Sequence, residues 1–375
     1  MNQSRGNNAD DLALPGTGAA PVRALVGVKE RLQFTGWLQY LLPVVIGLGL
    51  MALGGLGALI RPSLWWLMPG GVLVARGLAD IVILKLRLIP LPRRGLRPVT
   101  GDGFAVMRAR RACRSFEPRR MDEADEAFVR DRVEVHTGTG NPAALTGMPI
   151  RAEFVDAPLT VWPVVGAQQF LAVLGPAEYD RLAVIEAGRA LQEVVLDLTA
   201  RGIATCWIGP GAERQSVVTA LGPRFDAHRD HVLCVIAIGY ASHWMPLMAR
   251  MMRLAMHRRK PFADLVFAGA PGVPARLDRG PLKPFAKVFA ACRAAPSSYN
   301  SQTTRAVVEV DGKSLKQVSF CTTEGSRYYA PLALGIWCAN WARGVEALGA
   351  PGHWRPLPAP RALGGGLVED VVWTP

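Results

Sequence analysis

The feature that most constrains the fold is a run of 29 residues, 32–60, without a charged side chain. About 20 apolar residues suffice to cross ~30 Å of hydrocarbon, and soluble cores seldom need so long an uncharged run. A second apolar segment, 64–84, carries Arg76 and Asp80, which lie four apart and can pair on one helix face. Ionisable residues inside a span cost about 3 kcal/mol each. The sequence therefore predicts a transmembrane helical hairpin over 32–91, whose second segment either crosses the bilayer or lies at its interface.

Aromatic and basic residues flank these segments. Trp37 and Tyr40 at one end, and Trp65 and Trp66 beyond the other, have positions typical of interfacial belts. Basic residues flank both outer ends, whereas the tip, the turn 61–63, has only Arg61. The positive-inside rule thus predicts both termini and the soluble remainder on the cytoplasmic side of the membrane. Two alternatives are a buried hairpin in a soluble core and a cleaved signal peptide, the latter disfavoured because 31 residues precede the apolar run.

The positive charge of the chain is local. The net charge is +13 although half of the residues are hydrophobic. Eleven basic residues against two acidic ones fall within 85–120, and five basic residues fall within 250–260 without an acid. A nucleic-acid-binding protein usually spreads its basic residues along a face between stacking aromatics. We therefore expect no nucleic-acid partner. The six cysteines form no CxxC pair, so we expect reduced thiols.

The remainder of the chain has an α+β pattern. Apolar residues at three- and four-residue steps predict helices, and short β-branched runs bounded by turn formers predict strands. The predicted helices are 180–201, with Gly202 as C-cap, 284–295 and 329–349, and the predicted strands are 231–238 and 305–310.

Three short islands could carry chemistry: 110–116, 204–211 and 293–302. In the first, Arg110 and Arg114 lie four apart, which would put them on one face of a helix. Two guanidinium groups on one face suit a phosphate. The alternative is attraction of a basic juxtamembrane segment to anionic lipid, worth about 1 kcal/mol per residue.

Common catalytic motifs are missing from the sequence. It has no phosphate-binding P-loop, no HExxH and no GxSxG motif. His228 and His231 form a lone i, i+3 pair without a third ligand, so we expect no metal site. We assign no catalytic acid or base.

In this order, the islands resemble the FMN-dependent nitroreductase family, in its branch that carries both halves of the flavin site in one chain. The family's Arg-rich opening, GTCW loop, basic RKP segment and APS segment correspond to Arg110–Phe116, Gly202–Gly209, Arg258–Pro261 and Arg293–Arg305. The resemblance covers about residues 104–356. It implies a flavin-binding α+β sandwich of two related halves, preceded by the membrane hairpin.

Composition, hydropathy and the resemblance together predict a domain organisation. We expect a disordered tail at 1–31, the hairpin at 32–91, a linker at 92–103, a first nitroreductase-like half at 104–256, a connection at 257–280 and a second half at 281–375.

The cofactor implied by the resemblance is FMN, and no protein residue is assigned as catalytic. In the family, arginines and a basic pair hold the phosphate, a backbone loop meets the flavin edge, and the other half contacts the ring and ribityl chain. The corresponding residues are Arg110, Arg111, Arg114, Arg259 and Lys260 for the phosphate, Trp207, Ile208 and Gly209 for the edge, and Pro296, Ser297, Ser298 and Asn300 from the other half.

The implied activity is ping-pong hydride transfer from NAD(P)H through FMN to a small flat acceptor, a quinone or a nitro compound. Some motif positions differ: Ala112 replaces a Ser, Thr303 and Thr304 replace Pro-Trp, and Ala333 stands where an Asp is frequent. These differences motivate an alternative, a degenerate flavin-fold membrane protein that acts as a binding or assembly module without redox activity. The acceptor, the choice between NADH and NADPH, and homo-oligomerisation are left open.

Overall fold

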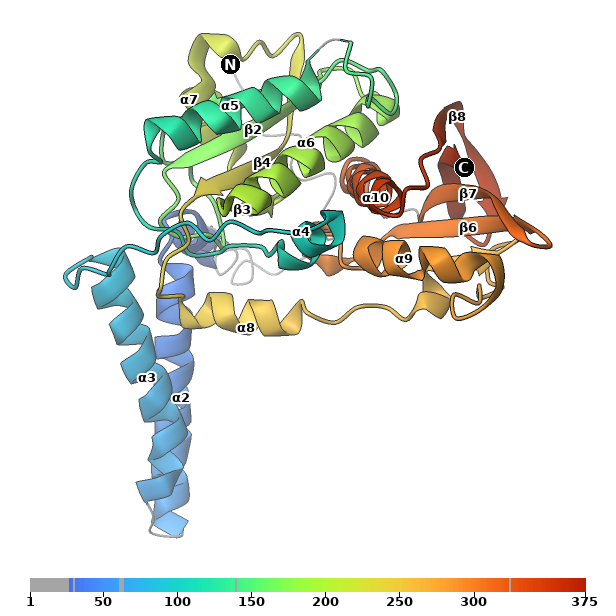
Figure 1. The fold of residues 1–375 in the computed structure, drawn as a ribbon. Coiled ribbons are helices and arrows are strands. Elements are labelled where there is room, and N and C mark those ends of the chain that lie inside the picture. The colour runs from blue at the N-terminus through green and yellow to red at the C-terminus, as the bar shows by residue number, and fades with distance from the viewer. Residues whose placement is uncertain (1–26, 30, 61–63, 139, 324) are drawn as a thin grey trace.

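A computed structural model describes residues 27–29, 31–60, 64–138, 140–323 and 325–375. The turn predicted at 61–63 and most of the predicted tail lie outside these residues. The described chain begins with a helical hairpin that projects from the rest of the molecule (Figure 1). Its elements are α2 (Leu38–Ile60), the 3₁₀ turn η1 (Leu64–Leu67), α3 (Met68–Asp80) and the π-helical turn η2 (Ile81–Lys85).

The hairpin is not a core element. Its two apolar stretches, Leu38–Leu59 and Trp65–Lys85, are each only 17% buried. The alternative of a hairpin buried in a soluble core is therefore wrong. The two helices touch through glycines, because a Cβ on Gly47 would lie 2.7 Å from the Gly70 carbonyl oxygen. Close backbone contact through small residues is typical of helix pairs in membranes.

The ionisable residues of the second segment join the hairpin to helix α8 (Leu247–Ala255). The predicted pair of Arg76 and Asp80 is present. The fully buried Asp80 carboxylate also accepts hydrogen bonds of 2.7 Å from the Trp244 indole and from the Leu247 amide. Arg76 donates to the Met245 carbonyl oxygen at 2.8 Å. These residues thus fix the base of the hairpin to the start of α8, which explains two charges in an otherwise apolar segment.

Two sheets form the rest of the molecule. The first has the order β1-β2-β4-β3 and is antiparallel, and the second has the order β5-β6-β7-β9-β8 with one parallel pair, β5 with β6. The strands of the first sheet are β1 (Arg151–Val155), β2 (Gln169–Pro176), β3 (Ala204–Ile208) and β4 (Asp230–Gly239). Those of the second are β5 (Val266–Ala268), β6 (Thr304–Asp311), β7 (Ser314–Thr323), β8 (His353–Gly364) and β9 (Leu367–Thr374).

Helices pack on these sheets (Figure 1). The α-helices are α4 (Gly103–Ala109), α5 (Glu123–Thr137), α6 (Arg181–Arg201), α7 (Arg214–Leu221), α9 (Ala286–Arg293) and α10 (Tyr329–Ala347). The 3₁₀ helices are η3 (Gly222–Arg224), η4 (Phe262–Asp264), η5 (Gly280–Phe285) and η6 (Ser298–Asn300).

The two long helices, α6 and α10, cross between the sheets at a pair of glycines. A Cβ on Gly335 would lie 1.9 Å from the Ile185 carbonyl oxygen, and one on Gly188 would lie 2.1 Å from that of Leu332. Any larger residue would push the helices apart. The crossing matters for function because the first turns of α10 are then held against the edge of the first sheet.

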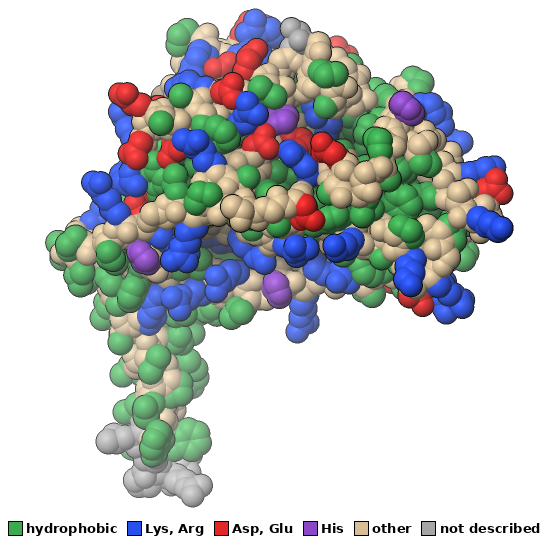
Figure 2. Space-filling model, in the orientation of Figure 1, with side chains coloured by type: hydrophobic (Ala, Val, Ile, Leu, Met, Phe, Trp, Pro, Cys, Tyr) green, Lys and Arg blue, Asp and Glu red, His purple; other side chains and the backbone are tan. Residues whose placement is uncertain are grey.

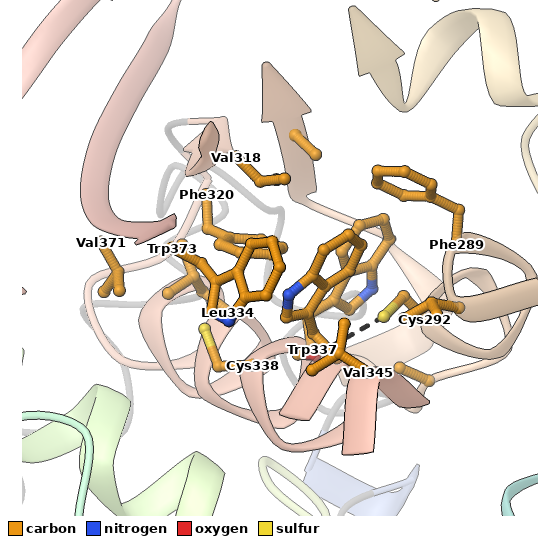
Figure 3. Packing of buried hydrophobic residues seen from close by; sticks show 14 of the residues in the cluster. Phe289, Cys292, Val318, Phe320, Leu334, Trp337, Cys338, Val345, Val371 and Trp373 are labelled. Atoms are coloured by element: carbon orange, nitrogen blue, oxygen red, sulfur yellow. Dashed lines mark hydrogen bonds between the residues drawn. The ribbon is translucent and has the colours of Figure 1, made fainter. Parts of the chain in front are cut away.

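The second sheet has an aromatic core under α9 and α10. The rings of Trp341 and Trp373 lie 5.2 Å apart in an edge-to-face arrangement, and Phe289 and Phe320 pack against Trp341. Figure 3 shows Phe289, Phe320 and Trp373 in this core. The Cys292 thiol donates to the Trp337 carbonyl oxygen at 3.6 Å. Aromatic pairs of this kind contribute about 0.5–1.5 kcal/mol beyond area burial. The helices and strands predicted from periodicity are confirmed by α6, β4, α9, β6 and α10.

Candidate functional site

A cleft opens between segments that adjoin the first sheet and segments that adjoin the second. The Arg-rich segment, the loop after β3 and helix α8 form one side, and the loop after α9 and the start of α10 form the other. Its lining is Arg110, Ala112, Arg114, Trp162, Pro163, Trp207, Ile208, Gly209, Pro210, Gly211, Cys234, Met252, Met256, Pro296, Ser297, Ser298, Tyr299, Tyr329, Leu332, Ala333 and Ile336. Mostly apolar walls with a few charged or hydroxyl groups are typical of a cofactor site.

The Arg-rich segment, residues 110–116, is extended. The prediction that Arg110 and Arg114 share a helix face is therefore wrong. Helix α4 ends at Ala109, and Arg110 has ψ 124°. The segment leaves the helix because it pairs with the open edge of β3, where the Cys113 amide donates to the Thr205 carbonyl oxygen at 2.8 Å. Side chains alternate along an extended chain. Arg110 and Arg114 therefore still face one side together, and that side is the cleft.

Glycines shape the loop after β3. A Cβ on Gly211 would lie 2.0 Å from the Trp162 carbonyl oxygen, and one on Gly209 would lie 2.7 Å from the Tyr329 ring. The loop can therefore pass close to both walls only without side chains at these positions. The indole of Trp207, on β3, donates to Gln192 of α6 at 3.3 Å, which fixes the ring beside the cleft.

The other wall is a loop with unusual backbone angles. Tyr299, Asn300 and Gln302 have φ of 49°, 56° and 50°, a left-handed region that costs a residue other than glycine about 1–3 kcal/mol. Hydrogen bonds hold the loop, since the Ser297 hydroxyl accepts from the Gln302 amide at 3.0 Å and the Asn300 amide group donates to the Arg258 carbonyl oxygen at 2.8 Å. Strain of this kind persists where surrounding contacts over-determine a loop, often at a ligand site.

Eight of the twelve predicted cofactor residues line the cleft: Arg110, Arg114, Trp207, Ile208, Gly209, Pro296, Ser297 and Ser298. Arg111 points to the opposite side of the extended segment, into a second cavity. The Arg259 guanidinium donates a hydrogen bond to the side-chain oxygen of Asn300 beside the cleft. The Lys260 amide donates to Gln302 at 2.9 Å, which joins the basic segment to the strained loop.

Positive charge is concentrated in and beside the cleft, around Arg110, Arg259 and Lys260. Burial, with the neighbouring Arg259 and Arg111, lowers the pKa of Arg110 to about 10. Burial and Arg293 lower the pKa of Arg259, and burial and Arg305 lower that of Lys260. Burial also raises the pKa of the Cys206 thiol despite Arg114 and Arg110 nearby, so this thiol stays neutral at pH 7. A cluster of cations that lowers its own pKa values favours a bound anion.

Two groups in the cleft lack partners among the residues that the structure describes. The Arg110 guanidinium is 9% exposed and makes no hydrogen bond or ion pair there. The buried Nε1 of Trp162 has no hydrogen-bond acceptor. Buried donors are nearly always satisfied in native proteins. A ligand with an anionic group and a hydrogen-bond acceptor would satisfy both, so the residues of this cleft fit a phosphate-bearing cofactor such as FMN.

Several cleft residues were not predicted from the sequence. Trp162 and Tyr329 come from segments that match no motif, whereas Met252 comes from α8 and Met256 directly follows this helix. The signal for the last two was present as a Met-rich stretch, 245–256, with the pair at i, i+4 spacing.

Comparison with protein families gives one match, to residues 104–336, for the model described as "Putative TM nitroreductase". No curated protein matches the chain.

Among solved structures, a protein of that description from Thermotoga maritima is 16% identical, with a TM-score of 0.46, and the match covers 76% of this chain and 99% of that chain. A nitroreductase with bound FMN from Bacteroides fragilis is 15% identical over 40% of this chain and 92% of that chain, with a TM-score of 0.32. An FMN-dependent nitroreductase from Mycobacterium smegmatis in complex with NADPH is 16% identical over 36% and 86%, with a TM-score of 0.29.

Proposed function

Because this chain belongs to the nitroreductase family whose model matches residues 104–336, we propose that it is a membrane-anchored, FMN-dependent oxidoreductase. When bound, FMN supplies ping-pong hydride transfer from NADH or NADPH to a flat electrophilic acceptor, a quinone or a nitro compound. Residues 104–256 and 281–375 would be the two halves of the site, joined by 257–280.

The observation that carries this proposal is the buried guanidinium of Arg110, which lines the cleft and has no partner within the part of the chain that the structure describes. A buried charge without a partner is strongly unfavourable. A phosphate monoester would compensate it. Arg114 lies on the same side of the extended segment, and Arg259 adds positive charge from beyond the first half.

The remaining residues would position the cofactor and exclude water. Trp162 offers an indole N–H to an acceptor atom, and Gly209 lets the backbone approach closely. Ser297 and Ser298 offer hydroxyl groups from the second half, where Asn300 supports their loop. The thioether and aliphatic walls keep the cleft apolar, which strengthens charge interactions inside it. Arg111, on the opposite side of the extended segment, is better suited to the second cavity described below.

The hairpin supports the membrane anchor. Its stretches are 22 and 21 residues long with mean hydropathy of 2.1 and 1.8, and a helix of that length extends for roughly 30 Å. Lys and Arg gather on the side of the α+β part from which the hairpin projects (Figure 2). By the positive-inside rule this side would face the cytoplasmic leaflet.

Protein purified in a neutral detergent tests the cofactor. We expect it to show the visible absorption band of an oxidised flavin, to lose it on anaerobic addition of NADH or NADPH, and to regain it on addition of a quinone or a nitro compound. The double variant Arg110→Ala/Arg114→Ala should lose flavin. The matched double variant Arg108→Ala/Arg120→Ala changes exposed arginines of the same region and should keep it.

Two outcomes would contradict the proposal. Colourless protein that cannot be reconstituted with FMN would instead support the alternative of a binding or assembly module, which the alanines at 112 and 333 in the cleft wall motivate. Full-length protein that leaves the membrane fraction under alkaline carbonate would contradict the anchor.

A further inference from the structure

A second cavity, of about 570 Å³, lies on the other side of the Arg-rich extended segment. The linker that follows the hairpin, the extended segment and helix α8 border it. Its lining includes four arginines, Arg94, Arg97, Arg111 and Arg253. Ala112 borders both this cavity and the cleft, so one thin segment separates the two.

The cavity has positive charge without compensation. None of its lining residues is an Asp or a Glu. Within the described ranges, the guanidinium groups of Arg94, Arg97 and Arg253 make no hydrogen bond or ion pair. Arg111 uses one nitrogen on neighbouring carbonyl oxygens and keeps its other donors. Four arginines around one space favour an anion, and guanidinium groups suit the paired oxygens of a phosphate.

Backbone carbonyl oxygens at the edge of the cavity already accept hydrogen bonds from other backbone amides. The last turn of α6 borders it, but the Ala200 carbonyl oxygen already accepts from the Val99 amide at 2.8 Å. The Leu198 carbonyl oxygen accepts from the Ile203 amide, also at 2.8 Å. Gly202, with φ 89°, ends this helix and has the Arg97 backbone 2.7 Å from where a Cβ would be. The linker is thus fixed on the α+β part, so its arginines are held at the cavity.

The same cavity has an apolar side. Leu96, Val99, Met245 and Leu254 line it, and Leu254 is 73% exposed. An inorganic anion would use only the cations. A phosphate attached to hydrocarbon chains would use both sides of the lining.

The position of α8 brings this cavity to the expected level of the lipid headgroups. Asp80 fixes the start of α8 to the base of the hairpin, and α8 runs crosswise to the hairpin along the underside of the α+β part (Figure 1). Its outward residues include Met251, 50% exposed, and Leu254, beside Arg250 and Arg253. Exposed apolar residues flanked by arginines are typical of helices that lie in the membrane interface.

We propose that this cavity binds the phosphate headgroup of an anionic phospholipid, with Arg97, Arg111 and Arg253 as its ligands. The proposal rests on the membrane anchor proposed above and is independent of the flavin. The lipid would act as a fixed contact between the bilayer, α8 and the segment that also carries Arg110.

Full-length protein in neutral detergent, titrated with phosphatidylglycerol or phosphatidylcholine and measured by native mass spectrometry, tests the site. We expect one phosphatidylglycerol bound at least tenfold more tightly than phosphatidylcholine. The variant Arg97→Gln/Arg253→Gln should weaken phosphatidylglycerol binding about tenfold or more. The variant Arg97→Lys/Arg253→Lys keeps both charges and should weaken it less.

The matched control is Arg93→Gln/Arg250→Gln, which also removes one charge from the linker and one from α8, at exposed residues that do not line the cavity. It should change binding less than twofold. Equal weakening in both glutamine variants would replace the site with diffuse surface attraction. Glycerol 1-phosphate that binds as tightly as the lipid would make the ligand a soluble phosphate and overturn the proposal. Flavin absorption on the same samples separates this test from the proposed activity, because colourless protein that binds phosphatidylglycerol selectively would contradict only the latter.

Discussion

Replacement of Arg110 by Met should make the apoprotein more stable while it weakens FMN binding. The guanidinium is 9% exposed and unpaired among the described residues, and its pKa is lowered to about 10. The usual value is about 12.5, and one pKa unit corresponds to 1.36 kcal/mol. The charged form is thus disfavoured in the folded apoprotein by up to about 3 kcal/mol. Since the pKa is lowered in the folded state, this cost is fully present at every pH below about 10.

Thermal unfolding of flavin-free protein at pH 7 measures the effect. Methionine has a similar stem without the charge, so the unfolding temperature of Arg110→Met should rise by several degrees, at about 2–4 °C per kcal/mol. FMN should bind about ten- to hundredfold more weakly, because a hydrogen bond to a charged group contributes about 1.5–3 kcal/mol. Arg108→Met, at an exposed position two residues earlier, should change stability by less than about 0.5 kcal/mol.

The result that would refute this reasoning is a variant less stable than the wild-type apoprotein. It would mean that Arg110 already has a partner in the absence of a ligand. A more stable variant with unchanged FMN affinity would keep the electrostatic argument but remove the phosphate role.

Three further predictions concern packing and pH. Gly335→Ala places a Cβ 1.9 Å from the Ile185 carbonyl oxygen and should lower the free energy of unfolding by about 1–3 kcal/mol or more in denaturant titrations, whereas Gly55→Ala, with no atom within 4 Å, should not. Asp80→Asn breaks a buried pair at the base of the hairpin and should cost about 3 kcal/mol in thermal unfolding, with Arg250→Gln as the unaffected control. Burial, Arg214 and Arg327 lower the pKa of His231 to about 4, so the free energy of unfolding should fall as the pH drops from about 6.5 towards 4. His231→Gln should reduce that fall by about 1–2 kcal/mol. A variant with the same pH profile as the wild type would contradict this prediction.

The family model confirms the resemblance and the nitroreductase-like α+β fold expected from the sequence. Local signals sufficed for much of that fold. Helix α6 has its apolar residues at helical spacing and a glycine at φ 89° directly after it, and β6 ends at a turn of Asp311 and Gly312. These features depend on neighbours in the chain, so a period and a cap reveal them.

The rest depended on contacts between distant segments. The helical spacing of Arg110 and Arg114 was misleading because the edge of β3, about ninety residues later, offers hydrogen bonds to an extended chain. The pair of Arg76 and Asp80 was expected, but its partners before and at the start of α8 lie more than 160 residues away. Neither the hydropathy of α3 nor the charge of α8 contains that information.

The basic residues within 85–120 therefore have more than one physical role. The extended conformation of residues 110–116 directs these side chains to two different places. Side chains in an extended segment alternate between two sides. Arg110 and Arg114 are thus brought into the apolar cleft, where burial lowers the pKa of Arg110, while Arg111 is turned towards the linker arginines and α8. A helix would have kept all three on one side, because residues three and four apart are neighbours there, and it would not have divided them between two spaces. The sequence left open two alternatives for these arginines, binding of a phosphate and attraction to anionic lipid. They are compatible because they apply to opposite sides of the same extended segment.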